Sequence, residues 1–199
     1  MKNDSIIKET NYWFDKFEVT VSKKQKIKSL SKGNQQKIQL ICSLIHKPSF
    51  LILDEPFSGL DPINFELLIN GILELKKSGT TIIFSSHNMV NVEQVCDELI
   101  MLKKGSIVLK GDIESVRESF GRTNIFLESS LDDKIFNHLD EILSIEKYKS
   151  NIRKITVSNP DVGKEIFDIV SKEGYISMFS QQPPSLEEIF KFKVGETVG

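Results

Sequence analysis

Two adjacent carboxylates, Asp54 and Glu55, directly follow a short, wholly apolar run at 50–53. Such a run without alternation is typical of a strand that is buried on both faces of a parallel sheet. In parallel α/β sheets, ligands bind beyond the carboxyl ends of the strands. Neighbouring side chains on an extended chain point in different directions, so the two carboxylates can take different roles. The pair therefore predicts a ligand crevice at the end of this strand.

A histidine, His87, follows a second predicted buried strand at 80–85. A histidine after a strand is usually a capping or core residue, and in isolation His87 would be interpreted in that way. Here, however, the strand that ends in Asp54 and Glu55 lies upstream, and parallel strands present their carboxyl ends at one edge of the sheet. We therefore predict that His87 lies beside the same crevice and has a functional role.

A third polar segment consists of Ser31, Lys32, Gly33 and Asn34, and a helical apolar pattern follows it at 34–46. A hydroxyl, a glycine-exposed backbone and a helix N-terminus together form an anion site. Taken alone, a serine and glycine before a helix would be an ordinary N-cap. The segment is interpreted as an anion site only because of the motifs that accompany it.

Four motifs occur in order along the chain: Leu-Ser-Lys-Gly-Asn at 30–34, Leu-Ile-Leu-Asp-Glu-Pro at 51–56, Ser-Gly-Leu-Asp at 58–61 and Ser-Ser-His at 85–87. In this order and spacing they resemble the second half of an ATP-binding cassette (ABC) ATPase. The resemblance implies ATP and Mg²⁺ as cofactors. It also implies phosphoryl transfer, in which catalysis is mostly positioning and charge neutralisation.

The resemblance implies a role for each residue of the crevice. Asp54 would be the ligand on the Mg²⁺ side, through water, and Glu55 would be the general base that polarises the attacking water. His87 would contact the γ-phosphate and link it to the catalytic carboxylate.

The resemblance also implies contacts between two subunits of a head-to-tail dimer. Ser31, Lys32, Gly33 and Asn34 would form the signature, which binds the ATP held by the opposite subunit. Lys32 and Asn34 stand where glycine and glutamine are more usual, and the lysine adds positive charge near the phosphates. The residues of the D-loop, which would couple the two sites, are Ser58, Gly59, Leu60 and Asp61.

The 199 residues contain no G-x-x-x-x-G-K-[ST] phosphate loop. That loop supplies the backbone nest and the lysine that hold the β- and γ-phosphates, so ATP binding within this chain is expected to be largely lost. The sequence thus predicts a subunit truncated at its amino terminus. The missing portion would include the strand beside 50–53, which would leave an unpaired edge and uncovered apolar surface.

The order of expected elements predicts two domains. Residues 1–121 alternate strands and helices, as in a parallel α/β sheet with crossover helices, and are interpreted as the distal part of a P-loop NTPase of the ABC type. Residues 122–199 change to a βαββαβ order with a helix at 131–139, which predicts a small α+β ferredoxin-like domain. A capping box at Ser185 opens a terminal helix. This second domain resembles the carboxy-terminal domain of ATP-binding subunits of the sodium-exporter type.

Charge and hydropathy limit the partners. The 26 basic and 28 acidic residues are nearly balanced, which argues against a strongly basic nucleic-acid binder, and we expect no nucleic-acid partner. No window approaches the ~18 apolar residues of a spanning helix. The expected partners are therefore a transmembrane permease and a second ATP-binding subunit. The expected location is cytoplasmic, peripheral at the inner face of the membrane through the permease.

Three functions compete at this point. The first is the ATP-binding and hydrolysing subunit of an ABC-type exporter, present as a truncated chain. The second is a non-hydrolysing or regulatory partner that offers its signature in trans to an intact subunit. The third, a DNA-repair or chromosome-type ATPase, predicts a heptad-rich coiled coil before the signature, for which residues 1–29 have no room.

Overall fold

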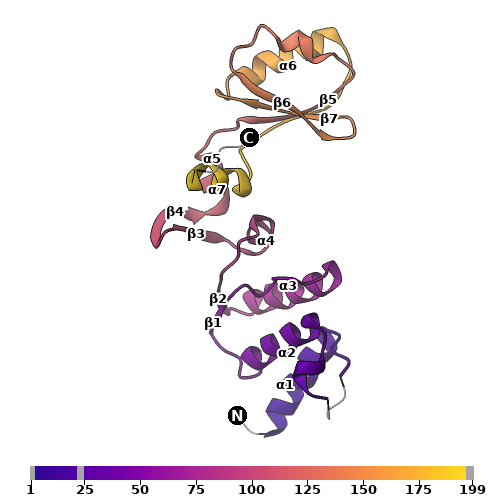
Figure 1. Cartoon of the computed structure of the whole chain (residues 1–199), viewed down its shortest axis with the longest axis vertical. Coiled ribbons are helices and arrows are strands. Elements are labelled where there is room, and N and C mark those ends of the chain that lie inside the picture. The colour runs from indigo at the N-terminus through magenta and orange to yellow at the C-terminus, as the bar shows by residue number, and fades with distance from the viewer. Residues whose placement is uncertain (1–2, 22–24, 196–199) are drawn as a thin grey trace. The chain divides into compact units, whose positions relative to one another are not determined.

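The computed structural model describes residues 3–21 and 25–195 (Figure 1). The chain divides into two compact units, Met1–Val95 and Cys96–Gly199. The first unit contains, in order, α1 (Asn3–Lys16), the 3-10 helix η1 (Ile27–Ser29), α2 (Lys32–Leu44), β1 (Phe50–Leu53), α3 (Pro62–Lys77), β2 (Thr81–Phe84) and α4 (Met89–Val95).

Strands β1 and β2 pair in parallel, and α3 connects them. This confirms the predicted parallel α/β arrangement with a crossover helix. The prediction that 50–53 is buried on both faces is wrong, because Leu51 is 6% exposed whereas Ile52 is 69% exposed. The helices of the first unit pack against one face of β1 only, so alternate side chains of the strand stay exposed.

The core of the first unit lies between β1 and the three longer helices. Gly71 allows α3 to approach α1 closely, since a β-carbon at this position would lie 2.3 Å from the Phe17 ring. The larger buried side chains of this core are Trp13, Phe17, Leu40, Ile41, Leu44, Leu51, Leu68 and Ile72.

Polar caps determine where α2 and α3 begin. Ser31 Oγ accepts a hydrogen bond from the Asn34 N–H at 3.3 Å, and Asp61 Oδ1 accepts one from the Asn64 N–H at 2.9 Å. These bonds satisfy backbone donors that have no partner within the helix. Because Ser31 is the cap, α2 begins at Lys32, earlier than the predicted start at residue 34.

The described part of the second unit contains a hairpin, a four-stranded sheet, three α-helices and one 3-10 helix. Its elements are β3 (Glu98–Lys103), β4 (Ser106–Asp112), α5 (Ile113–Glu118), β5 (Asn124–Ser129), the 3-10 helix η2 (Asp133–Phe136), β6 (Ile142–Lys149), β7 (Ile152–Val157), α6 (Val162–Glu173), β8 (Ile176–Gln182) and α7 (Leu186–Val194).

The four-stranded sheet has the order β6-β7-β5-β8, and every neighbouring pair is antiparallel. The alternating positions Ile125 and Leu127 on β5, with Ile155 on β7, are fully buried. They pack against Ile166 and Val170 of α6, which covers that face. The α+β module predicted for the second half of the chain is confirmed in its strand order.

The helix predicted at 131–139 is wrong. The chain forms only the four-residue 3-10 helix η2 there. The Asp132 side chain accepts a hydrogen bond from the Lys134 N–H at 2.9 Å, and the backbone bonds of this segment span three residues, as from Asn137 to Lys134. Short polar side chains that bond to the nearby backbone favour such turns over a continuous helix.

The compact units divide at 95/96, whereas the sequence predicts a domain boundary at 121/122. The segment 96–121 is held inside the second unit. Lys103 Nζ donates to the Lys193 carbonyl at 3.1 Å, and Arg117 Nε donates to the Pro184 carbonyl at 3.1 Å. The domain boundary at 121/122 stays a prediction. By contacts within the structure, the hairpin β3–β4 and α5 belong to the same compact unit as the carboxy-terminal sheet.

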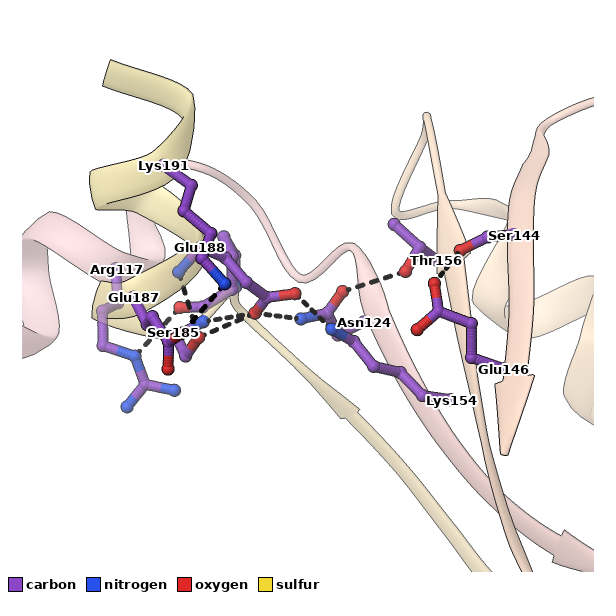
Figure 2. A network of polar contacts seen from close by, with 11 residues as sticks. Arg117, Asn124, Ser144, Glu146, Lys154, Thr156, Ser185, Glu187, Glu188 and Lys191 are labelled. Atoms are coloured by element: carbon purple, nitrogen blue, oxygen red, sulfur yellow. Dashed lines mark hydrogen bonds and ion pairs between the residues drawn. The ribbon is translucent and has the colours of Figure 1, made fainter. Parts of the chain in front are cut away.

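A network around Glu188 attaches α7 to the sheet (Figure 2). Glu188 accepts hydrogen bonds from Ser185 N at 2.8 Å, Ser185 Oγ at 2.9 Å and Asn124 Nδ2 at 3.0 Å, and it forms an ion pair with Lys154. Burial by itself raises the pKa of Glu188, but the bonds from Lys154 and Ser185 outweigh it and hold the pKa below its usual value. The capping box predicted at Ser185 is confirmed and has this tertiary role in addition.

Candidate functional site

The parallel register of β1 and β2 brings the polar residues after the two strands together. Leu53 pairs with Phe84, the last residue of β2, and the Ser85 N–H donates to the Leu53 carbonyl at 3.0 Å. Asp54 and Glu55 therefore leave the sheet beside the segment that leads to His87. The side chains that follow the two strands thus lie at the edge of the sheet where the sequence predicts a crevice.

Ser85 links the two carboxylate residues. Its hydroxyl donates to Asp54 Oδ1 at 2.5 Å and accepts from the Glu55 N–H at 2.9 Å. The sequence interpretation assigned no role to this serine, although it is the first polar residue after an apolar strand. A polar residue at that position faces its counterpart on the neighbouring parallel strand, and this signal could have identified it.

Glu55 and His87 form the central contact of the site. His87 Nδ1 lies 2.7 Å from Glu55 Oε1, and the side chains are 78% and 36% exposed, respectively. Glu55 has φ of +46°, the left-handed region that is uncommon for a residue with a side chain. This backbone conformation turns the chain away from the line of β1 and directs the carboxylate toward the histidine.

A cavity of about 360 Å³ adjoins this pair. His87 and Glu55 both line it and both are reached by solvent, so a polar ligand can reach the Glu55 carboxylate. Its lining residues are Glu55, Phe57, Ser58, Gly59, Leu60, Pro62, Phe65, Ser86, His87, Asn88 and Asn91.

The signature and D-loop segments of this chain contact each other. Lys32 extends over Gly59, where a β-carbon would lie 2.4 Å from Lys32 Nζ. Gln36 Nε2 donates to the Ser58 carbonyl at 2.8 Å, one turn further along α2. The sequence predicts that each motif contacts a partner subunit. In the structure the two motifs also contact each other within one chain.

Asp61 lies at the end of the D-loop segment and caps α3. Hydrogen bonds from the backbone and side chain of Asn64 hold the pKa of Asp61 below its usual value. Asn64 also packs on Gly33, because a β-carbon at Gly33 would lie 2.9 Å from Asn64 Nδ2. Asn64 thus joins the cap of α3 to the first turn of α2.

Lys37 is a buried cation behind the signature that the sequence interpretation did not identify. It is 4% exposed, and burial lowers its pKa, opposed by the negative charges of Glu18 and Asp61. It lies on α2 one turn after Gly33, which is also buried, so its positive charge is close to the segment predicted to bind an anion. A lysine on the buried side of an amphipathic helix is a signal that could have revealed it.

Asp54 is the residue that fits a magnesium ion. Magnesium prefers oxygen ligands and is usually held by one or two carboxylates together with water and substrate phosphates. Among the described residues, no group of three or more His, Cys, Asp or Glu side chains could hold a metal ion. A magnesium ion at Asp54 would therefore take its other ligands from water or from a bound phosphate group.

Two family models match the chain. One, described as the C-terminal domain of DrrA1-3-like ATP-binding proteins, matches residues 111–194. The other, described as an AAA domain, putative AbiEii toxin, type IV TA system, matches residues 5–93. Each match lies wholly within one compact unit, and neither match covers residues 94–110.

Curated relatives match nearly the whole chain. It is 42% identical over 195 residues to the uncharacterized ABC transporter ATP-binding protein YhaQ of Bacillus subtilis, covering 98% of this chain and 65% of the relative. It is 44% identical over 195 residues to the uncharacterized ABC transporter ATP-binding protein BpOF4_11395 of Alkalihalophilus pseudofirmus, covering 98% of this chain and 73% of the relative. The chain thus spans about two thirds of the length of these relatives.

Solved structures share the fold. A structure described as the ATP-binding subunit of an ABC transporter has a TM-score of 0.56 and 28% identity, covering 61% of this chain and 50% of that chain. The ATP-binding cassette MJ1267 in its ADP conformation has a TM-score of 0.51 and 22% identity, covering 60% of this chain and 47% of that chain.

The fold and the strand-end site define an α/β domain of the P-loop ATPase class, followed by a small α+β domain. The relatives that match along the whole chain then place it in one family. The chain belongs to the ABC transporter ATP-binding proteins, which confirms the resemblance given by the four motifs. No described helix has both the length and the apolar content that a membrane span requires.

Proposed function

We propose that this chain provides the hydrolysis and signature half of the ATP-binding subunit of an ABC-type exporter. The contact between Glu55 and His87, at 2.7 Å beside an open cavity, is the observation that carries this proposal. Proteins of this family use ATP with Mg²⁺ and work with transmembrane permease components. The exporter role rests on the resemblance of residues 122–199 to sodium-exporter-type subunits, and the transported substrate is left unassigned.

Glu55 acts as the general base in this proposal. Its carboxylate accepts a proton from the attacking water, and His87 holds Oε1 so that the carboxylate keeps one orientation. Ser85 fixes the backbone N–H of Glu55 and one oxygen of Asp54 at once, so the two carboxylates keep their relative positions. Fixed relative positions matter because phosphoryl transfer depends mainly on positioning.

Asp54 holds the metal side of the site. When bound, Mg²⁺ neutralises the charge that develops on the transferred phosphoryl group. The single carboxylate with its neighbouring serine hydroxyl suits an ion that keeps several waters.

Ser31, Lys32, Gly33 and Asn34 bind the nucleotide held by the opposite ATP-binding subunit, and Ser58, Gly59, Leu60 and Asp61 couple the two sites. The exposed Ser31 and Lys32 at the N-terminus of the 13-residue α2 support this assignment, because the helix end and the lysine both attract phosphate. Lys32 also contacts Gly59 in the same chain. A nucleotide bound at the signature can therefore change the position of the D-loop through Lys32.

The decisive experiment joins this chain to the phosphate-loop segment of the family and replaces Glu55 by Gln. ATP hydrolysis should fall by about a hundredfold or more, while ATP still binds. Glu66→Gln, on the exposed surface of α3, is the matched control and should hydrolyse ATP at the original rate. Hydrolysis by the Glu55→Gln protein at near the original rate would remove Glu55 from the role of base.

Two further measurements test the remaining assignments. Isothermal titration with Mg²⁺ and ATP should detect no binding by the 199-residue chain alone, because its sequence has no phosphate loop. Micromolar binding would contradict this. In the joined protein, Ser31→Arg should block nucleotide-driven dimerisation through bulk and charge, and unchanged dimerisation by light scattering would contradict the signature assignment.

The alternative, a non-hydrolysing partner that only offers its signature in trans, predicts that Glu55→Gln has no effect on turnover. The comparisons do not favour this alternative. The contact of Glu55 with His87 also supports hydrolysis over a purely regulatory role. The same Glu55→Gln experiment distinguishes the two functions.

A further inference from the structure

Helix α6 has two different stripes. Val162, Ile166 and Val170 are buried against the sheet. A second stripe, at helical spacing, borders a cavity of about 600 Å³ that lies wholly within the second unit. Its residues are Glu165, Asp168, Ile169, Lys172 and Glu173. The second stripe carries one apolar side chain, that of Ile169, among four charged ones.

The opposite wall of this cavity is the turn that replaces the predicted helix at 131–139. Ile135 and His138 line it. In a βαββαβ unit the two connecting helices lie on one face of the sheet. Here the second, α6, has 12 residues and extends about 18 Å, whereas η2 has four residues and extends only about 8 Å. Roughly half the length of α6 therefore lacks the helical neighbour that this arrangement normally supplies.

The cavity has an apolar floor and an acidic rim. Ile135 and Ile169 are half-buried against the core of the sheet. The rim carries three carboxylates against Lys172, a formal excess of two negative charges with His138 neutral. Within the described part of the chain, no ion pair neutralises those carboxylates. We call the seven lining residues the α6 groove.

We propose that the α6 groove binds a cytoplasmic amphipathic helix of the permease partner, with apolar side chains on Ile135 and Ile169 and basic side chains on the rim. A helix of this kind occupies the place that the short η2 leaves beside α6. Cytoplasmic segments of membrane proteins carry an excess of Lys and Arg, which suits the acidic rim. The choice of a permease as the source rests on the proposed function, whereas the shape and charge of the groove do not.

Binding is measured on the 199-residue chain with two labelled peptides of about 18 residues, roughly five helical turns. Both carry leucine on one helical face, and the other face is lysine in the first peptide and glutamate in the second. The lysine peptide should bind in the micromolar range by fluorescence anisotropy, with affinity falling as salt is raised, and the glutamate peptide should not bind. Equal binding of the two peptides would overturn the proposal.

Three variants locate the binding. Glu165→Lys combined with Asp168→Lys should weaken binding of the lysine peptide about tenfold, and Ile169→Ala should weaken it through loss of apolar contact. Glu98→Lys makes the same kind of charge change on an exposed residue of β3, outside the groove, and should change the affinity less than about twofold. An effect of Glu98→Lys as large as that of the rim variant would place the peptide elsewhere and overturn the proposal.

A second copy of the chain is the competing occupant. Light scattering should give the same mass for the native chain and the rim variant. A dimer that the rim variant converts to a monomer would show that the groove is an interface between copies and would overturn the proposal. Because these measurements use no nucleotide, their failure leaves the Glu55 experiment unaffected, and failure of the Glu55 assignment leaves the peptide result unaffected.

Discussion

Two polar clusters, the strand-end site of the first unit and the Glu188 network of the second, are built in different ways. In the strand-end site the Glu55 carboxylate has one described side-chain partner, the largely exposed His87. In the second unit the Glu188 carboxylate accepts from three residues, and Lys154 beside it is only 17% exposed. The two carboxylates are similarly exposed, 36% for Glu55 and 33% for Glu188, so the clusters differ in the number of donors and not in burial.

This is the difference that we expect between the proposed ligand site and a structural contact. A carboxylate that already accepts from several protein donors gains little from a ligand, whereas a carboxylate with one partner keeps acceptor capacity. The backbone of Glu55 is strained, since its φ of +46° is unfavourable for a residue with a side chain. Glu188 has no such strain and stabilises the fold. Substitutions in the two clusters should therefore affect different quantities.

The largest expected effect on stability is that of Glu188→Ala. The substitution leaves Lys154 and the 3% exposed Asn124 without their acceptor, and we expect the second unit to lose about 2 kcal/mol of unfolding free energy. Urea unfolding is followed by far-UV circular dichroism and by the fluorescence of Trp13, the single tryptophan, which reports on the first unit. Glu187→Ala, on the exposed side of α7, is the control. A Trp13 transition that shifts as much as the dichroism would contradict the separation of the two clusters.

The second effect concerns the contact between signature and D-loop. Gly59→Ala should destabilise the first unit by about 1 kcal/mol, because Gly59 has φ of +69° and Lys32 occupies the space of the new methyl group. Gly79→Ala, at φ of +91° with nothing within 4 Å, is the matched control for backbone strain alone. Trp13 fluorescence measures both. If Gly59→Ala costs no more than Gly79→Ala, the Lys32 contact has no energetic weight.

The sequence was sufficient for the elements that depend on local signals. The capping box at Ser185 and the parallel arrangement of the strands at 50–53 and 81–84 follow from residue types and spacing, and the structure contains them. The convergence of Asp54 and Glu55 with His87 also follows, because parallel strands end at one edge of a sheet.

Features that depend on long-range packing could not be predicted in this way. The segment 131–139 has an apolar pattern. The Lys134 N–H nevertheless donates to the Asp132 side chain, and the segment forms only a short 3-10 helix. The contacts of Lys32 with Gly59 and of Glu188 with Asn124 join segments whose separation in the chain contains no signal of proximity. Whether the second face of β1 is buried depends on which elements pack against it. The apolar pattern of the strand does not determine that.

A smaller effect is expected from pH. The pKa of Glu188 is lower in the folded chain than its ordinary value, so the folded state favours the carboxylate. The resulting stability is present above the unfolded pKa of about 4.3 and is lost as the pH falls toward and through the folded pKa. Urea midpoints from circular dichroism between pH 7 and acid should show this decline. Glu188→Gln should flatten it and Glu187→Gln should not, and an identical decline in both variants would assign it to other carboxylates.

The smallest expected effect is that of Glu55→Gln on stability. The side chain is 36% exposed, and the amide oxygen can still contact His87, so the unfolding free energy of the first unit should change by less than about 0.5 kcal/mol. Trp13 fluorescence during urea unfolding provides the measurement, and Glu66→Gln sets the level for a neutral surface change. A loss comparable to that of Glu188→Ala would mean that Glu55 is a structural residue like Glu188. The loss of hydrolysis in the same variant would then no longer identify a base, because a damaged strand end would explain it equally well.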